Sequence, residues 1–341
     1  MGDEILQQRA SPPLFFTARL PRLAIAATTA LLLVACSHAG PGVRASRDLQ
    51  FYGMRSTIEL APVHYAIDAL GASQTEVRHG GVPNLFTATD GPLADLAGHA
   101  ETQVLRNSLQ NPDVRILLTI TEGHYRVIAR RSAGIETVAD LAGKRIATMN
   151  GTSAAFYLHK VLLQAGLDEA DVAITSTPRP HDISRLLINR EVDALAIWEP
   201  EAQIAVAALG EDAVILDPDV GYSELYNLHT TAAHLGDPAM RARIVDYVAS
   251  VIAAQRAVVE RPGPAIALVS EASGYPAELI ERSWQHHSFP GALSPALLDT
   301  LVEEDAWLAA QEGREPRSRE QLTQLIDGSV VTEAKAQLEA R

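Results

Sequence analysis

The sequence has 341 residues, with 28 Lys and Arg against 42 Asp and Glu, so its formal net charge is −14. Because 47% of the residues are hydrophobic and only 21% are charged, burial of apolar surface can offset the entropy lost on folding, which excludes a disordered chain. The acidic balance excludes a general nucleic-acid binder, since no basic patch is available to replace phosphate counterions. At about 150 residues per domain, this length indicates roughly two domains.

The N-terminal region carries the pattern of an export signal. Residues 23–34 (LAIAATTALLLV) are the only long apolar stretch, and three arginines precede them. A stretch of this length is too short to span a bilayer and is typical of the apolar core of a signal peptide. Residues 33–36 (LVAC) resemble a bacterial lipobox, in which the peptide is cleaved before the cysteine and the cysteine sulfur is acylated.

We therefore predict an exported lipoprotein. Residues 1–36 form the signal region, Cys36 becomes the lipidated N-terminus that anchors the mature protein to the membrane, and residues 37–48 form a linker. A signal anchor with a chance cysteine is the alternative. Because Cys36 is the only cysteine, the sequence excludes a disulfide framework, a CxxC redox pair and a thiolate zinc site.

From residue 49 onward, strand-like and helix-like patterns alternate in chain order. The first series predicts strands at 49–54, 76–79, 93–97, 114–121 and 125–131, and helices at 61–70, 82–89 and 101–110. The second series predicts strands at 145–149, 172–176, 192–198 and 214–216, and helices at 153–165, 181–190 and 200–209. After residue 217 the chain is predicted to be mostly helical, at 237–260, 263–272, 276–286, 294–311 and 318–326. This alternation predicts an α/β fold with mostly parallel sheets flanked by helices.

Two segments of the second series resemble a known family. Residues 134–167 (GIETVADLAGKRIATMNGTSAAFYLHKVLLQAGL) and 191–203 (EVDALAIWEPEAQ) are similar to the substrate-binding proteins of nitrate, sulfonate and taurine ABC importers, a superfamily that also holds binders of thiamine pyrimidine precursors. The C-terminal stretches LLDTLVEEDAWLAAQEG and LTQLIDGSVVTEA resemble its closing helices. The resemblance implies a two-lobed periplasmic-binding-protein fold of type II whose hinge is crossed twice. Lobe 1 would comprise residues 49–131 and 217–341, and lobe 2 residues 132–216.

The same resemblance implies a function. A lipid-anchored, monomeric solute-binding protein would capture a small organic molecule between the lobes and deliver it to an ABC permease and its ATPase. The expected ligand is a sulfonate, an amino-sulfonate or an aminopyrimidine-like molecule. A ligand sensor, or an enzyme of thiamine pyrimidine metabolism that shares the fold, is the alternative.

Catalytic and metal-binding patterns are missing from the sequence. The enzyme branch of the superfamily depends on a cysteine-rich motif and histidines, which a chain with one cysteine cannot supply. GxSxG, HExxH, GxxxxGK[ST] and GxGxxG motifs are absent, and the 11 histidines show no ligand-like spacing. We therefore predict no enzymatic activity, no catalytic residues, no metal site and no cofactor.

Candidate ligand-binding residues follow the predicted strands, because ligands of open α/β sheets bind beyond the carboxyl ends of the strands. The candidates are Thr57, Glu59, His99, Glu101, Gly151, Thr152, Ser153, Trp198 and Glu199. Gly151 would let the backbone approach a ligand, while Thr152 and Ser153 would add hydroxyl groups at a helix N-terminus. An N-cap is the alternative role for Thr152 or Ser153.

The other candidates also have two possible roles. Trp198 could stack on a planar or cationic ligand or form the edge of the core. Glu101 could cap a helix, and Glu59 and Glu199 could be solvated rim charges. Since these loops contain no lysine and Arg55 is their only arginine, they favour an organic ligand with an amine or other donors over a bare anion. We expect Glu101 and Glu199 to select the donor-rich end of the ligand.

Overall fold

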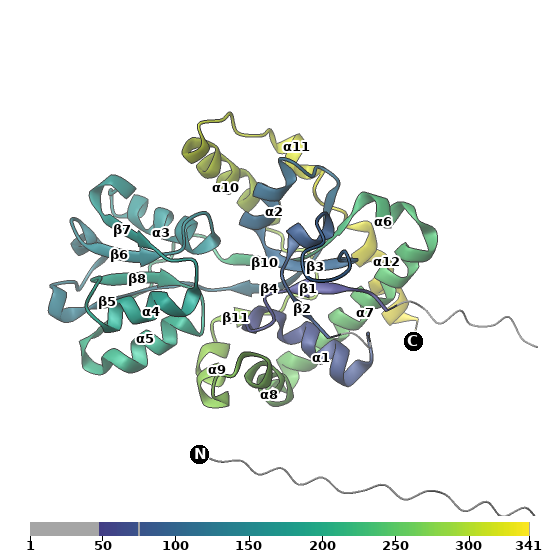
Figure 1. Cartoon of the computed structure of the whole chain (residues 1–341), viewed down its shortest axis with the longest axis horizontal. Helices are drawn as coiled ribbons and strands as arrows, with labels where there is room; N and C mark the ends of the chain where they lie inside the picture. The colour runs from purple at the N-terminus through teal and green to yellow at the C-terminus, as the bar shows by residue number, and fades with distance from the viewer. Residues whose placement is uncertain (1–47, 74–75, 341) are drawn as a thin grey trace, which may run out of the picture. The chain divides into compact units, whose positions relative to one another are not determined.

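The computed structural model describes residues 48–73 and 76–340, which form two β-sheets flanked by helices (Figure 1). The six-stranded sheet contains β1 (Phe51–Gly53), β2 (Arg78–His79), β3 (Leu96–Ala100), β4 (Val114–Gly123), β10 (Glu224–Thr231) and β11 (His287–Ser288). The five-stranded sheet contains β5 (Arg126–Arg130), β6 (Arg145–Thr148), β7 (Ala173–Ser176), β8 (Ala194–Ile197) and β9 (Ala213–Leu216).

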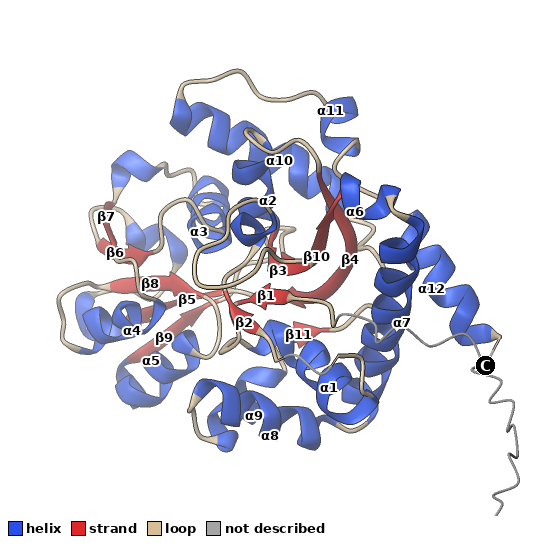
Figure 2. Cartoon of the chain, turned by 45° about the vertical axis from the view of Figure 1, so that its right-hand side comes forward, coloured by secondary structure: helices blue, strands red, loops and turns tan. Residues whose placement is uncertain are grey.

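The helices separate into two groups around these sheets (Figure 2). The group belonging to the five-stranded sheet is α3 (Ser153–Gln164), α4 (Pro180–Ile188) and α5 (Glu201–Leu209). The remaining helices are α1 (Ala61–Leu70), α2 (Glu101–Ser108), α6 (Ala232–Gly236), α7 (Pro238–Glu260), α8 (Pro262–Ser273), α9 (Ala277–Trp284), α10 (Leu297–Glu312), α11 (Arg319–Thr323) and α12 (Ser329–Glu339). The α/β architecture predicted from the alternating patterns is therefore confirmed.

Both sheets are mixed, which corrects the expectation of mostly parallel sheets. The six-stranded sheet has the order β11-β4-β10-β3-β1-β2, and β10 runs antiparallel to both of its neighbours. The five-stranded sheet has the order β7-β6-β8-β5-β9, and β5 runs antiparallel to β8 and β9. The reason is the path of the chain: it leaves the first sheet through β4 and returns through β10, so these paired strands must run in opposite directions.

The chain passes between the sheets twice, and the first crossing lies earlier than predicted. β5 was expected to end the first lobe at residue 131, but it pairs with β8 and β9 of the five-stranded sheet. The crossing segments are thus residues 124–125 and 217–223, between β4 and β5 and between β9 and β10. All five residues of β5 are buried, and such a strand fits either sheet by its own sequence.

Strand β10 is the largest departure from the sequence-based prediction. Residues after 217 were expected to be mostly helical, yet residues 224–231 form a strand whose eight residues are all buried. β3 also lies further along the chain than predicted, at Leu96–Ala100, so His99 is part of the strand and Glu101 begins α2. These differences change the environment of several candidate site residues.

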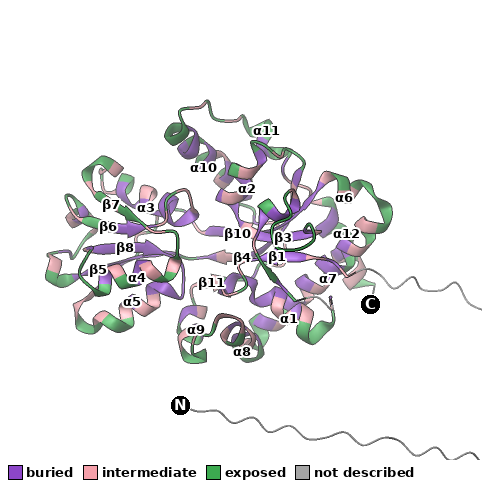
Figure 3. Cartoon of the chain, viewed as in Figure 1, coloured by how far each residue is buried: buried purple, intermediate pink, exposed green. Residues whose placement is uncertain are grey.

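The core follows from this arrangement of layers. α1, α7 and α12 pack together beside β4, and their apolar side chains form one cluster with those of the six-stranded sheet. α2 and α10 lie on the other side, where a second cluster continues into the five-stranded sheet. Figure 3 shows the central strands, such as β4 and β10, buried and the outer helix faces exposed, whereas the edge strands β2 and β7 are largely exposed.

Within the described residues, no helix combines the length and the hydrophobicity needed to cross a bilayer. The predicted signal region, Cys36 and nearly all of the predicted linker (residues 37–48) lie outside the described residues.

Candidate functional site

A cavity of about 560 Å³ lies where the ends of strands from both sheets approach each other. The segments that follow β1, β6, β7 and β8 contribute to its walls, as expected for a ligand site at the carboxyl ends of strands. Its principal lining residues are Met54, Thr57, His99, Gln103 and Arg106 from the six-stranded side, Met149, Thr152, Arg179 and Trp198 from the five-stranded side, and Tyr275 from the turn between α8 and α9. We call this space the outer compartment.

A smaller space of about 50 Å³ shares six lining residues with the outer compartment and reaches more deeply buried side chains. The shared residues are Met54, Thr57, His99, Gln103, Thr152 and Trp198. The additional residues include Glu59, Ser153, Glu224 and Tyr226, all of which are buried. We call this space the inner compartment.

The structure brings six of the nine predicted site residues to these compartments. They are Thr57, Glu59, His99, Thr152, Ser153 and Trp198. Glu101, Gly151 and Glu199 line neither compartment. Each of these three residues has a different structural environment from the one predicted.

Gly151 connects elements of the two sheets. Its backbone has a φ of +67°, in the left-handed region that favours glycine. Its carbonyl oxygen accepts hydrogen bonds from Gln103 Nε2 at 3.0 Å and from Arg106 Nη1 at 3.3 Å. A Cβ at this position would lie 3.1 Å from Arg106 Nη1. The close approach predicted at Gly151 is therefore made to Arg106 of this protein.

Glu199 belongs to a buried ion pair and is not a solvated charge at the rim of the cavity. Its side chain is 2% exposed and pairs with the guanidinium of Arg126. The carboxylate also accepts hydrogen bonds from Gln203 N at 3.0 Å and from Ser283 Oγ at 3.2 Å. Both oxygens of the Glu199 carboxylate therefore have partners within the protein. The ligand-selecting role predicted for Glu199 does not fit this position.

Glu101 is fully buried and holds the start of β10. Its carboxylate accepts hydrogen bonds from Tyr222 Oη and, at 2.8 Å, from Leu225 N. Burial raises the pKa of Glu101 to about 7, although these hydrogen bonds oppose the shift. Burial and the neighbouring Glu101 also raise the pKa of Glu304 well above its ordinary value. Glu101 therefore acts in the core, behind the wall of the cavity.

Two carboxyl groups line the inner compartment. Glu59 is 2% exposed and Glu224 is 4% exposed. Glu224 Oε1 accepts a hydrogen bond from Ser153 Oγ at 3.3 Å, and this hydroxyl also contacts Tyr125 Oη at 3.0 Å. Burial, followed by the charges of Glu59 and Glu101, raises the pKa of Glu224 well above its ordinary value.

His99 is held as a neutral imidazole beside the inner compartment. Its Nδ1 accepts the N–H of Val82 at 3.2 Å, so Nε2 carries the hydrogen of the neutral ring. Burial, with a smaller contribution from His79, lowers the pKa of His99 to about 4. His99 can therefore donate a hydrogen bond but carries no charge near neutral pH.

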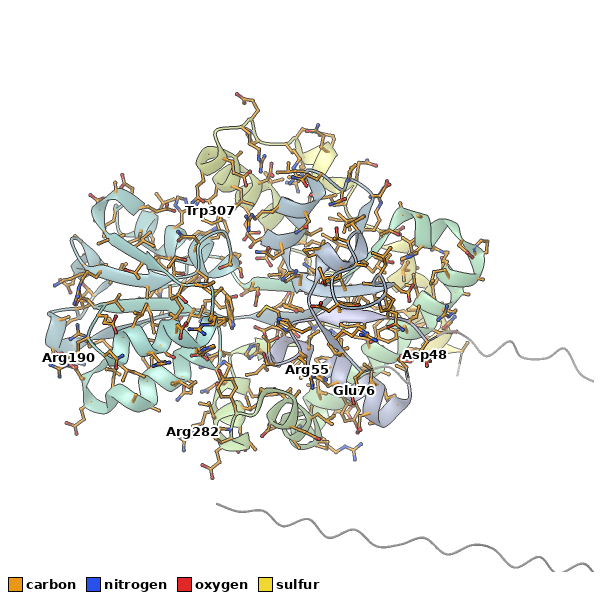
Figure 4. All side chains as sticks on the ribbon, viewed as in Figure 1. Asp48, Arg55, Glu76, Arg190, Arg282 and Trp307 are labelled. Carbon is orange, nitrogen blue, oxygen red and sulfur yellow. The ribbon has the colours of Figure 1, made fainter. Side chains whose placement is uncertain are left out.

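Cationic side chains lie only in the outer compartment. Arg106 contacts the Gly151 carbonyl and has no carboxylate partner among residues 48–73 and 76–340, whereas Arg179 pairs with Asp182 at 2.8 Å. Both arginines were missed, because Arg55 was taken as the only arginine near the strand ends. Arg55 lines a different pocket together with Glu76, and Figure 4 labels both residues.

Several contacts join the two groups of elements around the cavity. Tyr275 Oη donates a hydrogen bond to the carboxylate of Glu201. Trp307 of α10, labelled in Figure 4, donates its indole N–H to Glu169 at 3.0 Å, and its ring lies 5.4 Å from that of Phe156. These contacts hold the walls of the cavity close together in this conformation.

Glu224 and Tyr226 were not predicted as site residues because strand β10, which carries both, was not predicted. The sequence ELYNLHTT lacks a clear alternation of apolar and polar residues, since both faces of the strand are buried. The available signal was its content of tyrosine and threonine, which favour strands. Arg106 was not predicted as a site residue because it lies about one and a half turns into helix α2, whereas the predicted candidates were taken from the loops that follow strands.

No group of three or more His, Cys, Asp or Glu side chains is arranged to hold a metal ion within the part of the chain that the structure describes.

Comparison with known proteins agrees with this geometry. The model of the family described as NMT1/THI5 like matches residues 89–237, a range that includes both predicted segments of resemblance and strand β10. The putative aliphatic sulfonates-binding protein of Escherichia coli (strain K12) is 28% identical over 169 residues. This match covers 50% of the present chain and 51% of the relative, so the chain spans about half the length of the curated relative it matches.

Solved structures show the same fold over most of the chain. The alkanesulfonate-binding protein SsuA from Xanthomonas axonopodis pv. citri, bound to MOPS, has a TM-score of 0.63 and 20% identity, over 82% of this chain and 98% of that one. The periplasmic nitrate-binding protein NrtA from Synechocystis PCC 6803 has a TM-score of 0.68 and 13% identity, over 86% and 89% of the two chains.

An enzyme shares the fold as well. The desulfurization enzyme DszB has a TM-score of 0.60 and 17% identity, over 86% of this chain and 100% of that one. At these identities the structural matches show the fold alone. Residues 89–237 are similar to the NMT1/THI5-like family, and the chain has the fold of the periplasmic binding proteins for sulfonates and nitrate.

Proposed function

We propose that this protein is an extracytoplasmic solute-binding protein. It captures a small organic molecule in the cavity between the two sheets and delivers it to an ABC permease and its ATPase. The observation that carries the proposal is the cavity itself, whose walls come from strand ends of both sheets. Sites of this kind are typical of small-molecule binding in α/β folds, and about 300 to 1,000 Å³ is their usual size.

The proposed ligand classes are sulfonates, amino-sulfonates and aminopyrimidine-like molecules. The sulfonate-binding relative and the MOPS-bound protein of the same fold support a sulfonate group. Arg106 supplies a positive charge that could bind such a group, and Trp198 supplies a flat apolar surface beside it.

Binding without catalysis is the second part of the proposal. The fold does not decide this point, because DszB shares it. The lining hydroxyl groups support binding: Thr57 and Thr152 donate to the carbonyls of Met54 and Met149. Ser153 contacts Glu224 and Tyr125, so none of the three hydroxyls is paired with a histidine base.

The proposed location is the outer side of the cytoplasmic membrane. The predicted signal region supports export, and lipidation of Cys36 would tether the domain near its permease. Residues 48–340 would then form a monomeric binding domain above the membrane surface.

A thermal-shift screen tests the proposed function. The purified protein is heated with alkanesulfonates, amino-sulfonates, aminopyrimidines and aromatic acids, in dilute phosphate without sulfonate or amine buffers. A ligand at 100 times its Kd should add about 2.7 kcal/mol to the free energy of unfolding, which raises Tm by about 5 °C. Absence of any shift at millimolar concentrations of every class would contradict the proposal.

Two tryptophan variants locate the binding site in the same assay. Trp198→Ala should remove most of the ligand-induced rise in Tm, because Trp198 lines both compartments. Trp284→Ala is the matched control, since Trp284 packs against Phe289 away from the cavity and its loss should leave the ligand-induced rise intact.

A further inference from the structure

We infer that the ligand carries two charges: a protonated amine or similar cationic donor bound in the inner compartment between Glu59 and Glu224, and an anionic group held by Arg106 in the outer compartment. This inference rests on the proposed function and names the class of its ligand. It also moves the donor-selecting role from Glu101 and Glu199 to a different pair of carboxyl groups.

The first step is that both inner carboxyl groups have an unused oxygen. Glu59 Oε2 and Glu224 Oε2 are buried and have no hydrogen-bond partner among the described residues. Leaving a polar atom unpartnered inside a protein is costly, and buried polar atoms are nearly always hydrogen-bonded. Both atoms belong to side chains that line the inner compartment, so a ligand that enters it can supply the missing donors.

The second step is that neighbouring protein groups only partly meet the needs of these carboxyl groups. Hydrogen bonding by Tyr125 and Ser153 lowers the pKa of Glu224, yet its Oε2 has no hydrogen-bond partner among the described residues. His287 Nε2 lies 3.9 Å from the other oxygen of Glu59, Oε1, and its Nδ1 faces the Ser283 carbonyl at 3.2 Å. Glu224 Oε2 lies over Gly123, where a Cβ would be only 2.9 Å away. No arginine or lysine in the described part of the chain pairs with Glu59 or Glu224.

The third step is a comparison with the other buried carboxyl groups. Glu199 is paired with Arg126, Asp305 with Arg314 and Arg317, and Glu201 accepts from Tyr275 and Ser184. Glu304 Oε2 is the remaining carboxyl oxygen without a donor, and its side chain neighbours Glu101 outside the cavity. Unpartnered carboxyl groups at the cavity are therefore confined to its inner compartment.

The walls of the inner compartment suit a cation. Trp198 lines this compartment, and the electrons of an aromatic ring attract a cation placed over its face. Tyr226 Oη already donates to the Gly98 carbonyl at 3.0 Å and accepts from Met54 N at 3.3 Å, so it does not compete for the carboxyl oxygens. Binding of a cation would favour the charged form of Glu224, whose pKa is raised first by burial and then by the charges of Glu59 and Glu101.

The opposite end of the cavity suits an anion. Arg106 lines the outer compartment, and within residues 48–73 and 76–340 only the Gly151 carbonyl accepts from its guanidinium. Arg179, His79 and His181 line the same compartment. Glu201 also lines this compartment, but its carboxylate already accepts from Tyr275 and Ser184. Because the basic side chains lie at the outer end and the unpartnered acidic pair at the inner end, a ligand with separated opposite charges is oriented by the cavity.

Isothermal titration calorimetry with three probe series tests the inference. The series are ω-aminoalkanesulfonates, alkanesulfonates and alkylamines, each with two to six carbons, so that the best charge separation is found and not assumed. At that length, the aminoalkanesulfonate should bind about ten- to a hundredfold more tightly than the alkanesulfonate, as expected for a charged hydrogen bond. A water molecule on the two carboxyl groups would produce no such preference for the amine.

Variants then show which residues bind the amine end of the ligand and which bind its sulfonate end. Glu224→Gln and Glu59→Gln should remove most of the preference for the aminoalkanesulfonate and leave alkanesulfonate binding within about twofold. Arg106→Gln should weaken both sulfonate series and leave the alkylamines unchanged. Glu122→Gln is the control, since Glu122 pairs with Ser288 and lines neither compartment.

Three results would overturn the inference. The first is an alkanesulfonate that binds the wild type as tightly as the aminoalkanesulfonate, a comparison that holds even if a variant fails to fold. The second is equal loss of both probes in Glu224→Gln and Glu59→Gln. The third is that none of the three series binds while another solute class raises Tm; this result would leave the proposed function in place. If no compound in the thermal-shift screen raised Tm, the proposed function itself would be contradicted.

Discussion

The buried carboxyl groups of this protein differ in whether a protein cation pairs with them. Glu199 lies against Arg126, and Asp305 lies between Arg314 and Arg317. Hydrogen bonds from these two arginines lower the pKa of Asp305 despite its burial. Glu101, Glu224 and Glu304 have no such cation, and burial raises the pKa of each. The first group stabilises the fold in its charged form, and the second group does so in its neutral form.

Glu199→Gln tests the role of a paired carboxylate. Its removal leaves the buried Arg126 guanidinium without a counter-charge, which should lower the free energy of unfolding by about 3 to 5 kcal/mol. Urea denaturation followed by circular dichroism measures this loss. Glu211→Gln, at an exposed position, should change stability by less than about 0.5 kcal/mol. A Glu199→Gln protein as stable as that control would show that the pair does not stabilise the fold.

The unpaired carboxyl groups predict how stability depends on pH. The folded protein keeps protons on Glu224 and Glu304 that the unfolded chain has released near pH 4.5, so the free energy of unfolding should fall as pH rises. Each such proton contributes about 1.4 kcal/mol per pH unit. The informative range begins at pH 6.5, because His99 and His229, whose pKa values are lowered, stabilise with the opposite slope only below their ordinary pKa of 6.5, and Glu101, with a pKa of about 7, titrates above it.

Thermal or urea unfolding across this pH range measures the slope. Glu304→Gln removes one retained proton without altering the cavity lining and should make the slope shallower. The Glu211→Gln control should keep the wild-type slope. A stability that is constant or rises between pH 6.5 and 9 would contradict the raised pKa values.

At the scale of elements, β10 organises the site. It lies between β3 and β4, and it begins with Glu224 opposite Gly123, at the point where the chain re-enters the six-stranded sheet. Its polar side chains are bonded within the sheet: Thr119 Oγ1 donates to Asn227 Oδ1 at 2.9 Å, and Asn227 Nδ2 donates to the Leu225 carbonyl at 2.7 Å. These bonds let a strand with polar residues on a buried face remain in the core.

The two crossing segments are the elements about which the sheets can move. His124 of the first segment lies 2.7 Å from Asp217 of the second, so the two segments are in direct contact. Because only residues 124–125 and 217–223 join the sheets, a hinge at these segments would open and close the cavity.

Small-angle scattering tests this closure with Tyr275→Phe as the diagnostic variant. Saturating ligand should lower the radius of gyration of the wild type. Tyr275→Phe removes the hydrogen bond to the buried Glu201 carboxylate and should raise Kd by about tenfold. Tyr65→Phe, on α1 outside the cavity, is the control and should bind as the wild type does. An unchanged radius at saturation would indicate a rigid scaffold.

At the scale of the whole molecule, the N-terminal segment is proposed to direct export and to anchor the protein through Cys36. Cys36→Ser should block acylation and leave an uncleaved protein that no longer enters the detergent phase on Triton X-114 partitioning. Stability of the binding domain should be unchanged, because residue 36 precedes the described fold. Ser37→Ala, next to the proposed cleavage site, should partition like the wild type. Equal partitioning of Cys36→Ser and the wild type would contradict the lipid anchor.

Local sequence was sufficient wherever an element is specified by its own residues. Helix α1 occupies the predicted residues 61–70, because its apolar spacing and the left-handed Gly71 that follows are local features. The turn before α3 was also predicted, and it carries Thr152 and Ser153 to the cavity. The order of strands and helices, the α/β class and the family resemblance follow from features of this kind.

Tertiary structure decided what depends on partners distant in sequence. Strand β10 is stable because β3 and β4 lie on either side of it, and neither neighbour can be inferred from ELYNLHTT alone. Likewise, Glu199 and Glu59 both follow predicted strands, yet Arg126 pairs with Glu199, whereas no arginine or lysine of the described residues pairs with Glu59. A carboxylate's charge and its availability to a ligand are set by the groups around it, and long-range contacts bring those groups together.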